Sequence, residues 1–211
     1  ISKRYQPLLA NTYLTALSMF AYTDNSVEKE LSSTWTAAYN TILNCNVVLE
    51  NIDGSVGVLP EQERWMLKGE MLAVRAFLHF DMLRLFSASP AIDKERKAIP
   101  YLESYTNLPQ HQLTVGAVLE KVVKDLNAAR ELMREVDPYG PNYAKLESLY
   151  RNHPLLRNRQ KHLNYYAVTA LLARVQLYAG NLPDALEAAR EVIGQHYFTW
   201  TPSYEITTSD E

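Results

Sequence analysis

The chain has 211 residues, enough for one domain with a substantial buried core or for two small ones. Its 21 basic and 24 acidic residues give a net charge of −3, and no basic block stands out, which argues against a nucleic-acid partner. Only seven glycines and a hydrophobic content of 47% are typical of a helix-rich globular protein.

The chain has a single cysteine and no clear membrane-spanning segment. Cys45 can form neither an internal disulfide nor a cysteine zinc site, and it is expected to be a small buried residue. Two uncharged runs, 5–23 and 31–49, are as long as a membrane span but contain too many polar residues. Lys3 and Arg4 precede the first run, yet no Ala-x-Ala cleavage site follows, so we expect neither a span nor a signal peptide here.

The first part of the chain predicts two helices separated by a polar connection. Apolar residues at spacings of three and four predict a helix from 7 to about 21. The segment 22–32 is polar and is expected to be a loop. Ser33 or Thr34 can then cap a second helix, which is expected to end near Asn51.

The stretch 61–86 is the strongest helix prediction and the expected centre of the fold. Its two apolar stripes consist of Leu67, Met71, Val74, Leu78, Met82 and Leu85, and of Leu72, Ala76, Phe80 and Leu83. An ordinary surface helix has one such stripe, so we expect other helices to pack on two sides of this one. Trp65 is expected in the core, and Arg75 and His79 at the rim of the packing.

Two long excursions, 87–113 and 137–161, interrupt the helical pattern. Prolines punctuate both, and residues 98–102 within the first are expected to be extended. The second contains at most a short helix near 143–151, and its tyrosines argue against disorder. Between the excursions, Thr114 caps a strongly amphipathic helix.

The clearest local signal is a pair of helices near the end of the chain. Asn164 caps a helix that ends at Gly180, and Pro183 opens a second helix that ends at Gly194. The short connection predicts an antiparallel pair similar to the tetratricopeptide helix–turn–helix unit, although the signature Trp of that unit is absent.

We therefore predict an all-α fold of tetratricopeptide-like antiparallel helix hairpins, at about 34–87 and 114–194, with two long loop excursions. Residues 195–211 have a strand-like and turn-like composition without a partner strand. We expect 1–211 to form one helical domain, truncated before a further portion into which this tail leads.

Four stretches carry a family resemblance that extends over about 8–200. They are, in chain order, Trp35-x3-Tyr39-x2-Ile42-x3-Asn46-x-Val48; Gly69-Glu70 with Arg75-Ala76-Phe77-Leu78-His79-Phe80-Asp81-Met82-Leu83-Arg84-Leu85-Phe86; Ile99-Pro100; and Ala170-Leu171-Leu172-Ala173-Arg174-Val175-x-Leu177-Tyr178-Ala179-Gly180. Together they resemble the SusD/RagB-like nutrient-binding proteins of the Bacteroidetes outer membrane. The resemblance implies that this chain is the N-terminal helical part of a longer protein.

The resemblance also implies a function. It suggests a cell-surface, outer-membrane lipoprotein that captures oligosaccharides, or peptides in some members, and caps a TonB-dependent transporter of the SusC type. The signal peptide and the lipid-bearing cysteine would lie outside this chain, and no enzymatic activity is implied. Two alternatives remain: a tetratricopeptide-type module that binds peptides without a transport role, and an all-α carbohydrate-active enzyme with its site in the excursions.

The sequence predicts no catalytic site, metal site or cofactor. It contains no Gly-x-Ser-x-Gly, no phosphate-binding glycine loop, no His-Glu-x-x-His and no EF-hand loop. Its histidines are scattered without the spacing of metal ligands. Paired charges are instead expected along the helix packing, because a charge on a nearly buried helix needs a partner. The expected structural anchors are Trp35, Tyr39, Asn46, Arg75, Asp81, Arg84 and Arg174.

Sugar binding needs flat aromatic faces and hydrogen-bonding side chains, which lie most often on loops held by a rigid scaffold. Three loops qualify. Their candidate ligand-binding residues are Tyr22, Asp24 and Asn25; Tyr139 and Tyr143; and Trp200 and Tyr204. Packing against a further portion of the protein is the alternative role for these loop aromatics.

Overall fold

A computed structural model describes residues 12–141 and 158–195. In these ranges the regular elements are helices, with isolated β-bridges pairing Val56 with Leu59 and Lys97 with Thr114. The elements are α1 (Thr12–Ser18), α2 (Asn25–Asn51), the 3-10 helix η1 (Ile52–Ser55), α3 (Glu61–Phe86), α4 (Val115–Arg134), the 3-10 helix η2 (Arg159–Lys161), α6 (Tyr165–Ala179) and α7 (Leu182–Ile193). The all-α prediction is confirmed. None of these helices combines the length and the apolar character that crossing a membrane requires.

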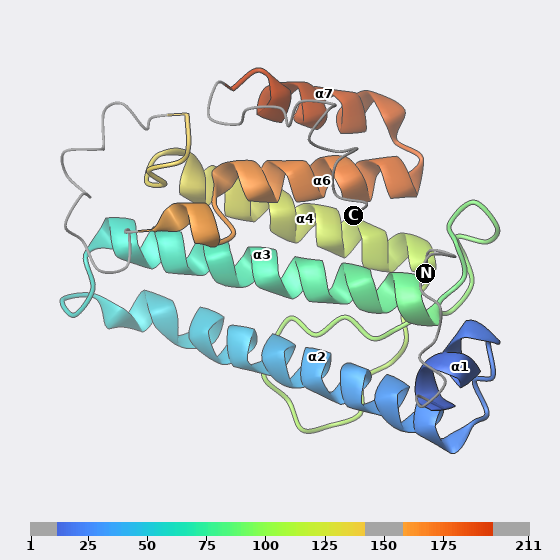
Figure 1. Ribbon diagram of the computed structural model, residues 1–211. Coiled ribbons are helices and arrows are strands. Elements are labelled where there is room, and N and C mark those ends of the chain that lie inside the picture. Colours follow the sequence, from blue (N-terminus) through green and yellow to red (C-terminus); the bar gives the residue numbers. More distant parts are fainter. Residues whose placement is uncertain (1–11, 142–157, 196–211) are drawn as a thin grey trace, which may run out of the picture.

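The long helices lie side by side, and each runs antiparallel to the next in sequence (Figure 1). Helix α3 packs against α2 on one side and α4 on the other, α6 packs on α4, and α7 covers α6. The prediction of layered helix hairpins is therefore confirmed, with α2 and α3 forming the first hairpin and α6 and α7 the last.

Helix α3 is enclosed by its neighbours, as its double apolar stripe predicts. Phe80 and Leu83 are fully buried, whereas Leu85 is 61% exposed. Trp65, expected in the core, is 37% exposed, although Glu63 and Met66 in the same turn of α3 are buried, so Trp65 lies on the outer face of the helix. Gly69 brings α4 close, since a Cβ atom there would lie only 3.2 Å from the carbonyl oxygen of Ala129.

Helix α2 begins earlier than the sequence predicts. The side chain of Asp24 accepts a hydrogen bond from the backbone N–H of Ser26 over 2.9 Å and caps a helix that starts at Asn25. Most of the expected loop 22–32 is thus helical, and the prediction that Ser33 or Thr34 caps this helix is wrong. The cap at Asp24 and the full burial of Val27 stabilise the first turn of this polar run as a helix.

Helix α1 ends at Ser18, three residues before the predicted end at 21. Phe20 has φ +56°, in the left-handed region, which breaks the helical path and turns the chain toward α2. The predicted first part of this helix, 7–11, lies outside the described residues.

The last hairpin agrees with the sequence at both ends of its first helix. The Asn164 side chain accepts from the backbone N–H of Ala167 over 2.9 Å and caps α6. Gly180 has φ +87°, which glycine adopts without strain, and ends the helix. The short connection then folds α7 back onto α6.

The first excursion runs along the helices as extended chain. The backbone N–H of Ala98 donates to the carbonyl of Leu113 over 2.8 Å, and the N–H of Leu113 donates to the carbonyl of Ile99 over 3.0 Å. These bonds place the predicted extended segment 98–102 beside the start of α4. The short helix expected near 143–151 lies outside the described residues.

Candidate functional site

A buried polar network joins α2, α3 and α4. The guanidinium group of Arg75 donates to both carboxylate oxygens of Asp125, over 2.7 and 2.9 Å, and to the side-chain carbonyl of Asn46 over 2.8 Å. Asp125 also accepts from the hydroxyl of Tyr101 over 2.7 Å. All four residues are buried, and burial raises the pKa of Tyr101, so its hydroxyl stays a donor. The network stabilises the packing of three helices.

His79 fastens the first excursion to α3. Its Nε2 accepts from the backbone N–H of Leu102 over 3.0 Å, so Nδ1 carries the proton and donates to the carbonyl of Arg75 over 2.9 Å. The ring stacks on Tyr101 with 3.8 Å between centroids. Burial lowers the pKa of His79 to about 3, so the ring is neutral. The prediction that Arg75 and His79 lie at the rim is wrong, because the excursion covers this face of α3.

Two side chains of α2 hold the same excursion. The hydroxyl of Tyr39 donates to the carbonyl of Pro100 over 2.8 Å. The side-chain nitrogen of Asn46 donates to the carbonyls of Leu102 and Ser104, each over 3.0 Å. These two expected anchors, Tyr39 and Asn46, therefore donate hydrogen bonds to backbone carbonyl groups of the excursion, which a loop cannot pair as regularly as a helix does.

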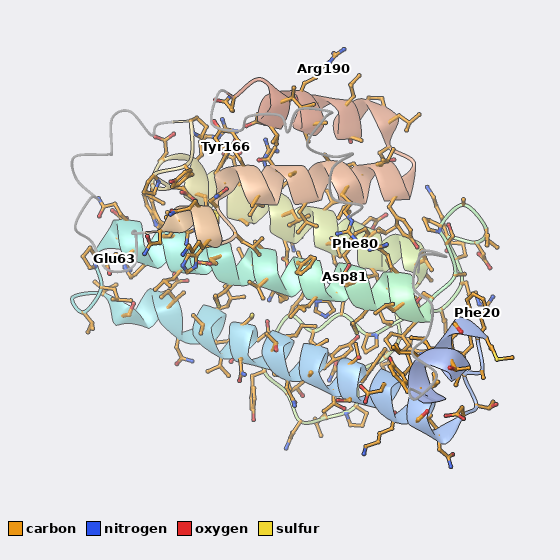
Figure 2. The ribbon with its side chains drawn as sticks, in the orientation of Figure 1. Phe20, Glu63, Phe80, Asp81, Tyr166 and Arg190 are labelled. Atoms are coloured by element: carbon orange, nitrogen blue, oxygen red, sulfur yellow. The ribbon has the colours of Figure 1, made fainter. Side chains whose placement is uncertain are left out.

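The remaining charged anchors lie on the face shared by α3 and α6. Asp81 accepts from Arg84 over 3.3 Å and lies 3.6 Å from the guanidinium of Arg174. Both guanidinium groups lie over the ring of Phe80, at 5.6 and 5.5 Å from its centroid. Phe80 and Asp81 are neighbours on this face in Figure 2.

A second polar cluster holds the ends of the second excursion. Arg159 is buried and donates to Glu70 of α3 over 2.7 Å and to Asp137 over 3.3 Å. Asp137 also accepts from the backbone N–H groups of Tyr139 and Tyr165, over 2.8 and 3.0 Å. Burial raises the pKa of Asp137, although the charge of Arg159 acts in the opposite direction. The cluster fixes the chain on both sides of 142–157.

An open groove of about 390 Å³ lies where α2 begins and α3 ends. Its lining consists of Tyr22, Glu28, Leu31, Ser32, Trp35, Thr36 and Phe86. Trp35 meets Phe86 edge-on, with 5.0 Å between ring centroids, and lies 4.6 Å from Tyr39. Tyr22 is 56% exposed. The groove thus combines partly fixed aromatic rings with a carboxylate and two hydroxyls, a pairing that suits a ligand with both apolar faces and polar edges.

The structure brings together only some of the predicted ligand-binding residues. Tyr22 lines the groove, and Asp24 and Asn25 are exposed beside it, with Asp24 engaged in capping α2. Hydrogen bonds from Ser26 lower the pKa of Asp24. Tyr139 follows the C-terminal end of α4, at the opposite end of the helices from the start of α2 (Figure 1). Candidates Tyr143, Trp200 and Tyr204 lie outside the described residues.

Sequence reasoning missed the polar side of the groove. Glu28, Ser32 and Thr36 recur every four residues and therefore share one face of α2. Leu31 and Trp35 lie on the same face, at spacings of three and four. This periodicity would have identified the lining if the helix had been predicted to start at Asn25. Trp35, expected only as an anchor, also lines the groove.

In the part of the chain that the structure describes, no group of three or more His, Cys, Asp or Glu side chains could hold a metal ion. The charged groups around Arg75 are satisfied by one another, and Arg159 pairs with Glu70 and Asp137, although its buried Nε has no hydrogen-bond partner among the described residues. The groove is therefore the strongest candidate for ligand binding within the described ranges.

A family comparison identifies the chain. The model of the SusD-like family described as starch-binding and associating with the outer membrane matches residues 5–143, more than half of the chain. The chain belongs to the SusD-like family. No curated protein matches this SusD-like chain.

Solved structures share the fold of this SusD-like chain. A SusD-like carbohydrate-binding protein from Bacteroides vulgatus has a TM-score of 0.68 and 22% identity, covering 87% of this chain and 34% of its own. A SusD superfamily protein from Bacteroides thetaiotaomicron has a TM-score of 0.66 and 26% identity, covering 82% and 34%. A surface glycan-binding protein A from Bacteroides fluxus has a TM-score of 0.59 and 18% identity, covering 85% and 33%. The SusD-like chain thus spans about a third of the length of these structures.

Proposed function

We propose that the chain is part of a non-enzymatic protein that captures oligosaccharides at the cell surface, and that the groove at the start of α2 holds one sugar unit. The decisive observation is the chemistry of its lining. Tyr22, Trp35 and Phe86 supply ring surfaces for the C–H faces of a pyranose, while Glu28, Ser32 and Thr36 supply hydrogen-bonding groups for its hydroxyls. Family membership supports carbohydrate as the ligand class.

The charge inventory supports binding without catalysis. Glycoside hydrolysis ordinarily requires two carboxyl groups that flank the scissile bond. Among the described residues that line the groove, Glu28 is the only carboxylate. The buried side chains of His79 and Asp125 are each occupied by hydrogen bonds that hold α3, α4 and the first excursion.

The groove is tested by glycan binding to the purified chain. Tyr22→Ala should weaken binding of maltoheptaose or another bound oligosaccharide by about tenfold, because it removes one exposed ring from the groove. Tyr105→Ala is the matched control, since Tyr105 is 58% exposed but does not line the groove. Titration calorimetry with a panel of linear glucans and peptides measures the ligand affinities of both variants.

Three outcomes would contradict this function. They are equal affinities for the two tyrosine variants, binding of peptides with no binding of any glycan, and release of reducing ends from a bound oligosaccharide. The first removes the groove as the site, the second favours a peptide-binding module, and the third favours an enzyme.

Delivery to a SusC-like TonB-dependent transporter belongs to the same proposal, as does a lipid anchor carried by the whole protein. The outer-membrane association of the family model supports both. Affinity purification of the tagged full-length protein from outer membranes should recover such a transporter in about equal amounts. Recovery of the tagged protein alone, under mild detergent, would count against delivery.

A further inference from the structure

A second cleft lies between the first excursion and the last hairpin. Its volume is about 380 Å³, and it is formed by the start of α4, the end of α6, the start of α7 and Lys94. Among the described residues, it shares no lining side chain with the aromatic groove. The aromatic groove and this cleft, both formed by described residues, therefore differ in their chemistry.

The floor of this cleft is aliphatic and small. It consists of Leu119, Val123 and Ala179, and no aromatic ring is among the described lining residues. Such a floor cannot stack against a pyranose ring, but it fits a methyl-sized apolar group. Leu119 and Ala179 are almost fully buried, so the floor is held by the packing of α4 against α6.

A buried amide lies at one side of this floor. Gln176 is 6% exposed, and its Oε1 accepts from the side-chain nitrogen of Asn181 over 2.8 Å. Within the described part of the chain, its own Nε2 donates no hydrogen bond to a protein acceptor. Because Gln176 lines the open cleft, this N–H group is available to donate to a ligand carbonyl.

The rim of the cleft supplies hydrogen-bond acceptors, which complement the amide donor of Gln176. Glu120 comes from α4 and Asp184 from the first turn of α7, and both are exposed and line the cleft. A carboxylate accepts hydrogen bonds only, so these groups suit an amide N–H or a sugar hydroxyl. Lys94 adds a donor on the remaining side.

We propose that this cleft binds the acetamido group of an N-acetylated sugar. The methyl group rests on the aliphatic floor, the carbonyl oxygen accepts from the Nε2 of Gln176, and the amide N–H donates to Asp184. The choice of a sugar over another secondary amide rests on the proposed function. The protein would then hold a glycan at two places, one by ring stacking and one by its acetamido substituent.

The test compares ligands that differ only in this substituent. The purified chain is titrated with N,N′-diacetylchitobiose and with cellobiose, which has the same linkage but no acetamido groups, and ¹⁵N shifts are followed. We expect diacetylchitobiose to bind at least about fivefold more tightly and to shift the backbone N–H signals of residues 176–182 and of Asp184. N-acetylalanine methylamide supplies the same amide chemistry in a peptide.

Matched variants locate the site. Gln176→Met and Asp184→Asn should each weaken diacetylchitobiose binding by about three- to tenfold. Glu187→Gln, on the exposed side of α7 and outside the cleft, should leave it unchanged. Asp184 is exposed, so its variant is expected to fold, and circular dichroism checks the Gln176 variant.

The two proposals fail in different ways. Equal binding of the two disaccharides, or no effect of Asp184→Asn, overturns the acetamido site while glucan binding at the groove stands. Stronger binding of the peptide amide also overturns it. Loss of diacetylchitobiose binding in Tyr22→Ala would show that both ligands share the groove, which overturns the second site alone. The absence of any glycan binding removes both.

Discussion

The Arg75 network and the aromatic groove use opposite kinds of residue in opposite settings. At the meeting of α2, α3 and α4, charged and polar side chains are buried and saturated by one another. At the start of α2, by contrast, aromatic and hydroxyl side chains line an open groove. The residues that match the family motif therefore serve mainly the fold, and residues outside the motif form most of the candidate site.

The largest effect should come from breaking the network. Arg75→Ala leaves Asp125 buried without its main partner, which should lower the free energy of unfolding by roughly 3–5 kcal/mol. Arg84→Ala is the matched change on the same helix. Because the Arg84–Asp81 pair is partly exposed, its loss should cost less than about 1 kcal/mol. Urea denaturation followed by circular dichroism measures the free energy of unfolding of both variants. Similar losses of stability would contradict the distinction between the buried Arg75–Asp125 pair and the partly exposed Arg84–Asp81 pair.

The next effect concerns pH. His79 stays neutral in the fold, where burial lowers its pKa to about 3, but in the unfolded chain it takes up a proton below about pH 6.5. The unfolded state thus binds more protons between these values, and stability falls as the pH falls from 6.5 toward 3. This histidine should contribute a slope of about 1.4 kcal/mol per pH unit there.

Urea denaturation of His79→Gln between pH 4 and 7 tests this slope, at each pH in the same buffer. The variant should be less stable than the parent at pH 7 but should lose stability less steeply on acidification. His111→Gln, at an exposed position, should keep the steep slope of the parent. Parallel curves for the parent and His79→Gln would show that His79 is not the group responsible.

The smallest effect on stability should come from the groove. Ser32→Ala with Thr36→Ala removes two exposed hydroxyls from its lining, and the unfolding free energy should change by less than about 0.5 kcal/mol. Glycan affinity should nevertheless fall by about three- to tenfold. The adjacent pair Ser33→Ala with Thr34→Ala, which is exposed but does not line the groove, should alter neither quantity. For both double variants, calorimetry measures the glycan affinity and urea denaturation measures the free energy of unfolding.

Local signals predicted the helix ends well where one residue determines the outcome. Thr114 and Asn164 cap their helices, and Gly180 adopts the left-handed conformation that ends α6. The same reasoning failed at Asp24, because residues that cap helices are also those that favour turns. Only Val27 and Leu31 interrupt the polar run there, which is too few apolar positions to indicate a helix.

The candidate site was harder to predict than the fold. The sequence indicates that Arg75 needs a partner, but it does not say which carboxylate supplies it, and Asp125 lies fifty residues away. His79 is buried because the first excursion folds over α3. The spacing of apolar residues along a helix does not show where such a loop will fold. The groove could be recognised only from the true start of α2, because the misplaced cap left Glu28 and Ser32 outside the predicted helix that contains Thr36.

The placement of the groove has a consequence for how such proteins diversify. Glu28, Ser32 and Thr36 face solvent along one helix, and none of them takes part in the interior network. Exchanges at these positions can therefore accumulate without endangering folding, so the glycan preference proposed for the groove can change while the scaffold stays the same. A randomised library at these three positions would sample new ligand preferences of the proposed groove on an unchanged scaffold.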